Sequence, residues 1–133
     1  MSRELTLTIV DGVRIVVPDR LDHATPYVLQ EQGDWFEDEI RFLRHAMQPG
    51  GKAVDIGANY GLYTLSIARA VGPTGHVWAY EPAERTHAFL TRSVQANRFD
   101  HVTVERCAVS DQVGMGHLSL NVQPELKLSL IHI

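Results

Sequence analysis

The sequence predicts an α/β fold built on a parallel sheet of the Rossmann type. Between residues 53 and 109, apolar strand-like runs alternate with segments of helical periodicity. This strand–helix–strand–helix–strand order is typical of parallel strands joined by right-handed crossovers. Two glycines, Gly57 and Gly61, follow the first of these strands. Ligands of open parallel sheets bind at that turn, so we look for function there.

Composition and charge are those of a soluble globular protein. The chain has 133 residues, of which 44% are hydrophobic and 21% charged, and that length suits a single domain. The net charge of −4 argues against nonspecific nucleic-acid binding, which depends on basic residues at phosphates. One cysteine permits no internal disulfide, and no apolar run approaches the ~20 residues that span a membrane. We therefore expect a cytoplasmic protein with no membrane or nucleic-acid partner.

The first predicted element is a β-hairpin in residues 5–17. Asp11-Gly12 favours a type I′ turn, because glycine tolerates the positive φ that this turn requires. Apolar residues alternate with polar ones on both sides of it: Leu5, Leu7, Ile9, Val13, Ile15 and Val17. Residues 18–33 contain Pro18, Pro26 and Gly33, and we expect a loop there.

A helix is predicted next. Asp34 is placed as its N-cap, with Glu37 three residues later in capping-box spacing. Four apolar residues then share one helical face: Phe36, Ile40, Leu43 and Met47. The Pro-Gly-Gly sequence at 49–51 ends this helix.

The parallel unit follows in five elements. Strands are predicted at 53–56, 76–80 and 102–109, and helices at 62–71 and 84–96. Gly72-Pro73 ends the first of these helices, and Asn97 is placed as the C-cap of the second. Residues 116–133 show two alternating apolar runs around Pro124, and we expect a hairpin there.

The glycine turn indicates a ligand that approaches the main chain. Gly57 and Gly61 carry no Cβ, and the start of the following helix offers free N–H groups to a carboxylate or phosphate. The G-x-x-x-G spacing matches neither the dinucleotide fingerprint nor the P-loop. A nicotinamide-dependent oxidoreductase is therefore disfavoured.

Two acidic residues narrow the ligand class. Glu81 ends the second parallel strand, where a carboxylate can accept hydrogen bonds from both hydroxyls of a ribose. Asp55 lies beside the glycine turn, which suits a ligand with an ammonium group or another positive centre. S-adenosylmethionine combines a carboxylate, an ammonium group, a sulfonium, a ribose and an adenine, and we expect it as the cofactor.

Three stretches resemble the FkbM-type family of S-adenosylmethionine-dependent methyltransferases: DIGANYGLYTLSIARAVGP, HVWAYEP and VTVERCAVSD. The lead-in GDWFEDE is also similar, and the resemblance runs from about residue 25 to residue 120. It implies that the methionine end of the cofactor is lined by Asp55, Gly57, Asn59 and Gly61. It implies further that Glu81 holds the ribose and that Ala108 lies against the adenine. Ala58 and Pro82, within the same motifs, complete the predicted cofactor-binding residues.

The resemblance implies methyl transfer, most simply to oxygen on a small molecule or sugar. In this family the sheet continues into a fourth strand with an acidic residue near the reaction centre, and nothing in residues 121–133 resembles it. We therefore divide the chain into a hairpin, loop and helix (1–48) and a cofactor-binding domain (49–133) that is incomplete at its C-terminus. We name no catalytic residue. A cofactor-binding module without activity is the alternative function, and self-association through an open sheet edge is expected.

Structural roles stay open for several of these residues. Gly57 and Gly61 could serve only helix–strand packing. Asp55 and Asn59 could cap the first parallel helix, and Glu81 the second. Other residues are expected to be purely structural: Trp35 and Glu37 in capping and packing, and Cys107 as a buried apolar residue of the third strand. The seven histidines are scattered and predict no metal site.

Overall fold

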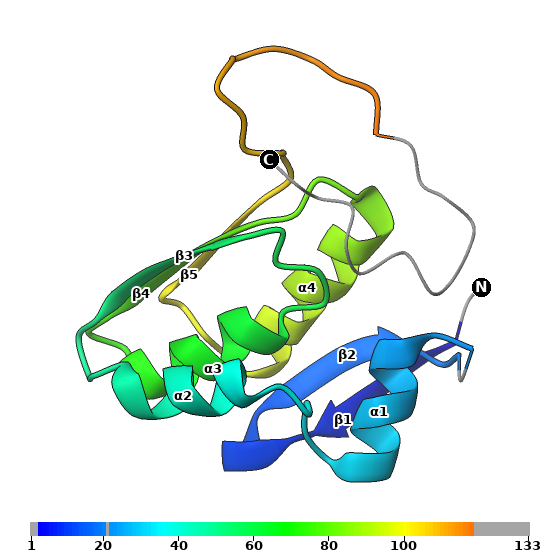
Figure 1. Ribbon diagram of the computed structural model, residues 1–133, viewed down its shortest axis with the longest axis vertical. Helices are drawn as coiled ribbons and strands as arrows, with labels where there is room; N and C mark the ends of the chain where they lie inside the picture. The colour runs from blue at the N-terminus through cyan, green and yellow to red at the C-terminus, as the bar shows by residue number, and fades with distance from the viewer. Residues whose placement is uncertain (1–2, 21, 119–133) are drawn as a thin grey trace.

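The computed structural model describes residues 3–20 and 22–118 (Figure 1). Three parallel strands form the central sheet in the order β3-β4-β5. Their bounds are Lys52–Ile56 for β3, His76–Tyr80 for β4 and Val102–Glu105 for β5. Helix α3 (Leu62–Val71) and helix α4 (Glu84–Ala96) make the crossovers. The predicted βαβαβ unit is confirmed, and so is Asn97 as the C-cap of α4.

Strand β5 is shorter than predicted. The observed strand ends at Glu105 and covers only the first half of the range 102–109 in which a strand was expected. Cys107 and Ala108 follow the strand and are exposed, and the expectation that Cys107 is a buried strand residue was wrong. The apolar spacing of this stretch resembles a strand, but residues 105–108 are exposed in the described part of the chain. The hairpin expected in 116–133 lies almost wholly outside the described residues.

The N-terminal hairpin is confirmed. Strand β1 (Glu4–Thr8) pairs antiparallel with β2 (Arg14–Pro18), and a short 3₁₀ turn, η1 (Val10–Gly12), connects them. Asp11 and Gly12 have φ values of 62° and 69°, the positive values expected for this Asp-Gly pair. The connection is longer than the two residues of a simple type I′ turn, because Thr8 pairs with Arg14 and five residues, 9–13, lie between them.

The loop predicted for residues 18–33 was wrong in its second half, which forms α1 (Ala24–Gln32). Pro26 lies in the first turn of this helix, where the backbone N–H that proline lacks would have no intrahelical partner. Gly33 ends the helix with φ 67° in the left-handed region. The proline and the glycine therefore mark the two ends of a helix instead of a loop.

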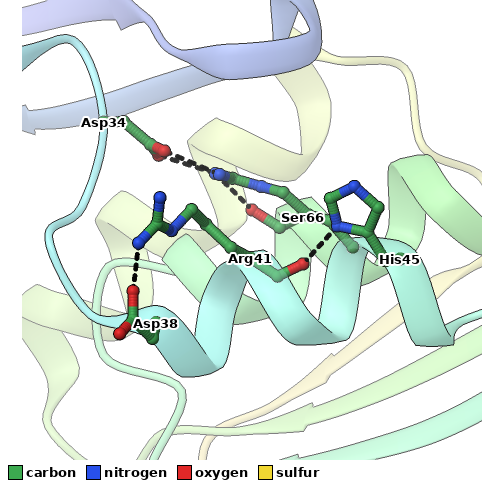
Figure 2. A network of polar contacts seen from close by, with 6 residues as sticks. Asp34, Asp38, Arg41, His45 and Ser66 are labelled. Carbon is green, nitrogen blue, oxygen red and sulfur yellow. Dashed lines mark hydrogen bonds and ion pairs between the residues drawn. The ribbon is translucent and has the colours of Figure 1, made fainter.

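Helix α2 (Asp38–Ala46) begins four residues after the predicted N-cap. Its N-cap is Glu37, whose side chain makes no capping hydrogen bond. Asp34 instead lies in the preceding segment and pairs with Arg44 at 2.7 Å on both carboxylate oxygens. Figure 2 shows Asp34 facing α2 from that segment, with Ser66 of α3 beside the Arg44 guanidinium that binds Asp34. The predicted apolar face holds for Ile40, which is fully buried, but Phe36 is 61% exposed.

The hairpin packs on α4 and shares one core with the parallel unit. Within the hairpin interface, Ser93 Oγ accepts a hydrogen bond from the Val16 N–H at 2.8 Å. Asn97 exchanges two hydrogen bonds with the Arg14 backbone, at 2.8 Å and 2.6 Å. Buried apolar side chains fill the space between them, Ile15 and Val17 from β2 and Leu90 from α4 among them. This packing fixes the N-terminal segments relative to the glycine turn.

The parallel sheet is covered by helices on one face (Figure 1). Ala53 and Asp55 of β3 point toward α3, whereas Val54 and Ile56 point away and are 59% and 51% exposed. Strand β3 is an edge strand of the sheet in the described part of the chain. Within that part, no helix is both long and apolar enough to cross a membrane.

The exposed edge generates a prediction about association. We expect the 133-residue chain to self-associate, because an apolar edge strand with unpaired N–H and C=O groups favours pairing with another chain. Val54→Lys should shift the population toward monomer in size-exclusion chromatography with light scattering. Val10→Lys, at an exposed apolar position in the hairpin loop, is the matched control and should leave the association unchanged. A wild-type chain that is monomeric at all concentrations would contradict this expectation.

Candidate functional site

A pocket of about 190 Å³ lies at the carboxyl end of β3. One wall comes from the end of this strand, the glycine turn and the first turn of α3. That wall consists of Asp55, Gly57, Ala58, Asn59, Tyr60, Leu62 and Tyr63. The pocket therefore brings together four of the eight predicted cofactor-binding residues: Asp55, Gly57, Ala58 and Asn59.

The opposite wall comes from segments that precede the parallel unit. It consists of Thr25 of α1 and of Trp35 and Glu37, which lie just before α2. Trp35 is 8% exposed and belongs to the core, as the packing interpretation expected, but it also faces the pocket. Glu37 is the N-cap residue of α2 and likewise faces the pocket. Trp35 and Glu37, for which the sequence favoured structural roles, therefore also line the pocket.

Asp55 is bound to the start of α3. Its carboxylate accepts a hydrogen bond from the Thr64 hydroxyl at 2.6 Å. Burial raises the pKa of Asp55, and hydrogen bonding to Thr64 opposes the rise. The first N–H groups of a helix have no intrahelical partner, and among the described residues those of Leu62 and Tyr63 have no other hydrogen-bond partner either. Asp55 caps the helix, and it still borders the pocket.

The backbone of the glycine turn is tied to the end of β4. The N–H groups of Gly57 and Ala58 both donate to the Tyr80 carbonyl oxygen, at 2.9 Å and 3.0 Å. Gly57 has φ 74° and Asn59 has φ 54°, so the turn visits the left-handed region twice. Asn59 is not the N-cap of α3, a position that Gly61 holds. The N–H groups of Gly57 and Ala58 are therefore engaged within the fold.

Glu81 joins the two ligand-facing turns. One carboxylate oxygen accepts from the Asn59 N–H at 2.8 Å, and the other accepts from the Ala83 N–H at 2.9 Å. Ala83 is the N-cap of α4, so the capping role left open for Glu81 is present. The residue is only 1% exposed, and burial raises the pKa of its carboxyl against the two backbone hydrogen bonds. Its oxygens do not reach the wall of the pocket.

Gly61 is a packing residue. A Cβ at this position would lie 2.5 Å from Leu90 Cδ1 of α4, and its φ of 98° disfavours any side chain. Its N–H donates to the Ala58 carbonyl oxygen at 2.9 Å. The packing role that the sequence left open for Gly61 therefore accounts for this glycine.

The remaining two predicted residues lie away from the pocket walls. Pro82 is half-buried between Glu81 and the start of α4, and Ala108 is exposed after β5. Sequence reasoning missed four pocket residues: Thr25, Tyr60, Leu62 and Tyr63. The last three stand in the turn and the first helical turn after it, and that placement was the available signal. Thr25 gave none, because its segment was expected to be a loop.

Tyr63 and Glu37 connect the two walls. The Tyr63 hydroxyl donates to Glu37 Oε2 at 2.5 Å. Burial, together with this hydrogen bond and the charge of Glu37, raises the pKa of Tyr63 well above its ordinary value. Tyr63 thus remains protonated at neutral pH and keeps donating to Glu37.

The segment that carries Glu37 is anchored by the Asp34–Arg44 pair. The side chains of these residues are 20% and 8% exposed. Burial tends to raise the pKa of Asp34, but hydrogen bonds from Arg44 and the Trp35 N–H outweigh it and lower the pKa. Arg44 also contacts Ser66 Oγ of α3 at 3.3 Å, so one guanidinium links the segment to both helices. In the described residues, no three His, Cys, Asp or Glu side chains lie close enough together to hold a metal ion.

Comparison with known sequences gives a short match. The chain is 53% identical over 32 residues to the ubiquinone/menaquinone biosynthesis C-methyltransferase UbiE of Burkholderia mallei and of Burkholderia thailandensis. The match covers 24% of this chain and only 13% of those relatives. No protein-family model matches, so membership of the FkbM family stays a prediction.

Comparison with solved structures shows the fold. TYW2 from P. horikoshii, in complex with MeSAdo, is 18% identical with a TM-score of 0.56 and covers 79% of this chain and 36% of its own. Trm5b from Pyrococcus abyssi is 18% identical with a TM-score of 0.55 and covers 76% and 27%. A SAM-dependent O-methyltransferase from Thermotoga maritima is 18% identical with a TM-score of 0.51 and covers 77% and 40%. The chain has the Rossmann-like α/β fold of these solved structures, among them a SAM-dependent O-methyltransferase.

The packing at Gly61 can be tested by comparing two glycines. Gly61→Ala should destabilise the protein by about 2–4 kcal/mol, because it adds overpacking against Leu90 to left-handed strain. Gly12→Ala is the control, since Gly12 has φ 69° and nothing within 4 Å of an added Cβ. It should cost about 1–2 kcal/mol from strain alone. Equal losses in urea denaturation would show that close packing is not what Gly61 provides.

Proposed function

We propose that the pocket binds the methionine end of S-adenosylmethionine and that the chain is the cofactor-binding part of a methyltransferase. The observation that carries this proposal is the chemistry of the pocket. Two carboxylates, Asp55 and Glu37, border it, and none of its ten described lining residues is basic. Such a site disfavours a phosphate and favours a ligand with positive charge. The fold shared with a solved SAM-dependent O-methyltransferase, and with TYW2 in complex with MeSAdo, supports the same ligand.

The groups of the pocket match the groups of the cofactor. The free N–H groups at the start of α3, those of Leu62 and Tyr63, suit its carboxylate. Asp55 suits a positive centre of the ligand, and the aromatic rings of Trp35 and Tyr60 suit its apolar and cationic parts.

The ribose is assigned to Glu81. Each of its carboxylate oxygens accepts one backbone hydrogen bond, so acceptor capacity remains on both. Because Glu81 is 1% exposed, ribose binding requires the turn at Asn59 to open toward the ligand. The N–H contact from Asn59 is the one that such an opening would change first.

We propose transfer of the methyl group to oxygen on a small molecule or sugar. In such a transfer the acceptor oxygen would attack the methyl carbon in line, the electron pair of the carbon–sulfur bond would return to sulfur, and the proton of the acceptor hydroxyl would pass to a general base. Most of the protein's contribution is to hold the two reactants at the right distance and orientation. A methyl-transfer assay with candidate acceptors distinguishes this activity from a module that binds the cofactor without turnover.

Isothermal titration tests the cofactor directly. We expect S-adenosylhomocysteine to bind and NAD to bind much more weakly or not at all, because Glu37 and Asp55 repel a pyrophosphate. Measurable binding of NAD without binding of S-adenosylhomocysteine would overturn the proposal. Circular dichroism on the same sample confirms that the chain is folded.

The raised pKa of Asp55 predicts a pH dependence of binding. S-adenosylmethionine carries a sulfonium, and the ionised Asp55 favours that positive centre, so affinity for S-adenosylmethionine should be constant at neutral pH and fall as the pH drops through this pKa, which lies above the ordinary value for an aspartate. Asp55→Asn should bind more weakly at neutral pH and should lose this part of the pH dependence. Asp38→Asn, at an exposed position of α2, is the matched control. Identical pH profiles for the wild type and Asp55→Asn would exclude Asp55 as the group concerned.

A further inference from the structure

Glu37 is a carboxylate in the pocket to which the proposed function assigns no particular group of the cofactor. It belongs to the segment before α2, outside the strands and turns where ligand residues of parallel sheets are sought. It nevertheless shares the pocket with Asp55, and both residues contribute to its polar lining. A side chain that served only to cap α2 would not need this placement, and its carboxylate makes no capping hydrogen bond.

The structure holds Glu37 in a fixed orientation. The Tyr63 hydroxyl donates to Oε2, and the raised pKa of Tyr63 keeps that proton on the phenol. Among the described residues, no further hydrogen bond to Glu37 is found, so Oε1 is left to accept from a ligand. The Asp34–Arg44 pair fixes the segment from the other side, three residues before Glu37. The Glu37 side chain is held by Tyr63, and its backbone segment is held by the Asp34–Arg44 pair. A carboxylate held in this way is suited to recognise a ligand group at a defined position.

The start of α3 places a ligand carboxylate close to this oxygen. Tyr63 lines the pocket, its backbone N–H has no hydrogen-bond partner among the described residues, and its side chain binds Glu37. In an amino acid, the ammonium group and the carboxylate share one carbon. A carboxylate at the N–H of Tyr63 therefore brings its ammonium group within the reach of Glu37.

We propose that Glu37 is a specificity residue that binds the α-ammonium group of the cofactor's methionine moiety. This inference rests on the proposed function, since it assigns a second residue to the same ligand. The N-terminal part of the chain thereby takes part in ligand binding, which the division at residue 48 did not anticipate. The site distinguishes a ligand that carries the amino-acid group from one that lacks it.

The test compares two ligands on the full 133-residue chain. S-adenosylhomocysteine carries the ammonium group, and 5′-methylthioadenosine lacks the whole amino-acid group. Glu37→Gln should weaken binding of S-adenosylhomocysteine by roughly tenfold, the scale of a charge-assisted hydrogen bond, and should change binding of 5′-methylthioadenosine by less than about twofold. Glu39→Gln, an exposed acid two residues away on α2, is the control and should bind both ligands as the wild type does.

Each outcome of the titration decides the matter. An unchanged affinity for S-adenosylhomocysteine in Glu37→Gln overturns the assignment, and so does an equal loss for both ligands, which would make Glu37 structural. If Glu37→Gln does not fold, Glu37→Asp, which keeps the charge on a shorter side chain, replaces it. The same comparison then applies: its affinity for S-adenosylhomocysteine should fall more than its affinity for 5′-methylthioadenosine. If the wild type binds 5′-methylthioadenosine and S-adenosylhomocysteine equally, the ammonium assignment fails while the nucleoside site stands. If the folded wild type binds neither, the proposed function fails with it.

Discussion

The buried carboxylate of Glu81 is the interaction on which the ligand-facing end of this protein depends. It lies where β4 ends, and its two oxygens accept the N–H of Asn59 in one turn and of Ala83 in the next. Hydrogen bonds to a charged group contribute about 1.5–3 kcal/mol each, and an unpaired buried N–H costs a comparable amount. One side chain therefore sets the shape of both turns. A residue that binds a ligand's ribose in this position must exchange part of that internal role for the contact with the ligand.

The rest of the pocket follows from how α3 begins. Gly61 allows the helix to approach Leu90 of α4 closely, and Asp55 accepts a hydrogen bond from the Thr64 hydroxyl. Leu62 and Tyr63 of the first helical turn then line the pocket. The segment before α2 then closes the other side, held by Arg44 through its bonds to Asp34 and Ser66. A network of polar contacts that looks purely structural thus positions Glu37.

Sequence reasoning predicted the parallel unit well because its signals are local. Helix α3, strand β4 and helix α4 have the expected bounds, since apolar periodicity and a glycine or asparagine mark their ends. It failed at α1, where Pro26 and Gly33 occur at helix ends as readily as in loops. It also failed at Asp34, which was expected to cap a helix. The Asp34 carboxylate instead pairs with Arg44, ten residues away. For the site, the motif located Asp55 and the turn, but no local pattern could show that Trp35 and Glu37 fold over them. Their position depends on tertiary packing.

Residue-resolved NMR on ¹⁵N-labelled protein tests the central claim most directly. The amide signals of Asn59 and Ala83 report the two hydrogen bonds of Glu81, and those of Leu62 and Tyr63 report the free start of α3. On addition of S-adenosylhomocysteine, all four signals should shift, with Asn59 changing most because its turn must open for the ribose. Binding that shifts other amides and leaves Asn59 and Ala83 in place would show that the ligand site lies elsewhere and that Glu81 is only a structural residue.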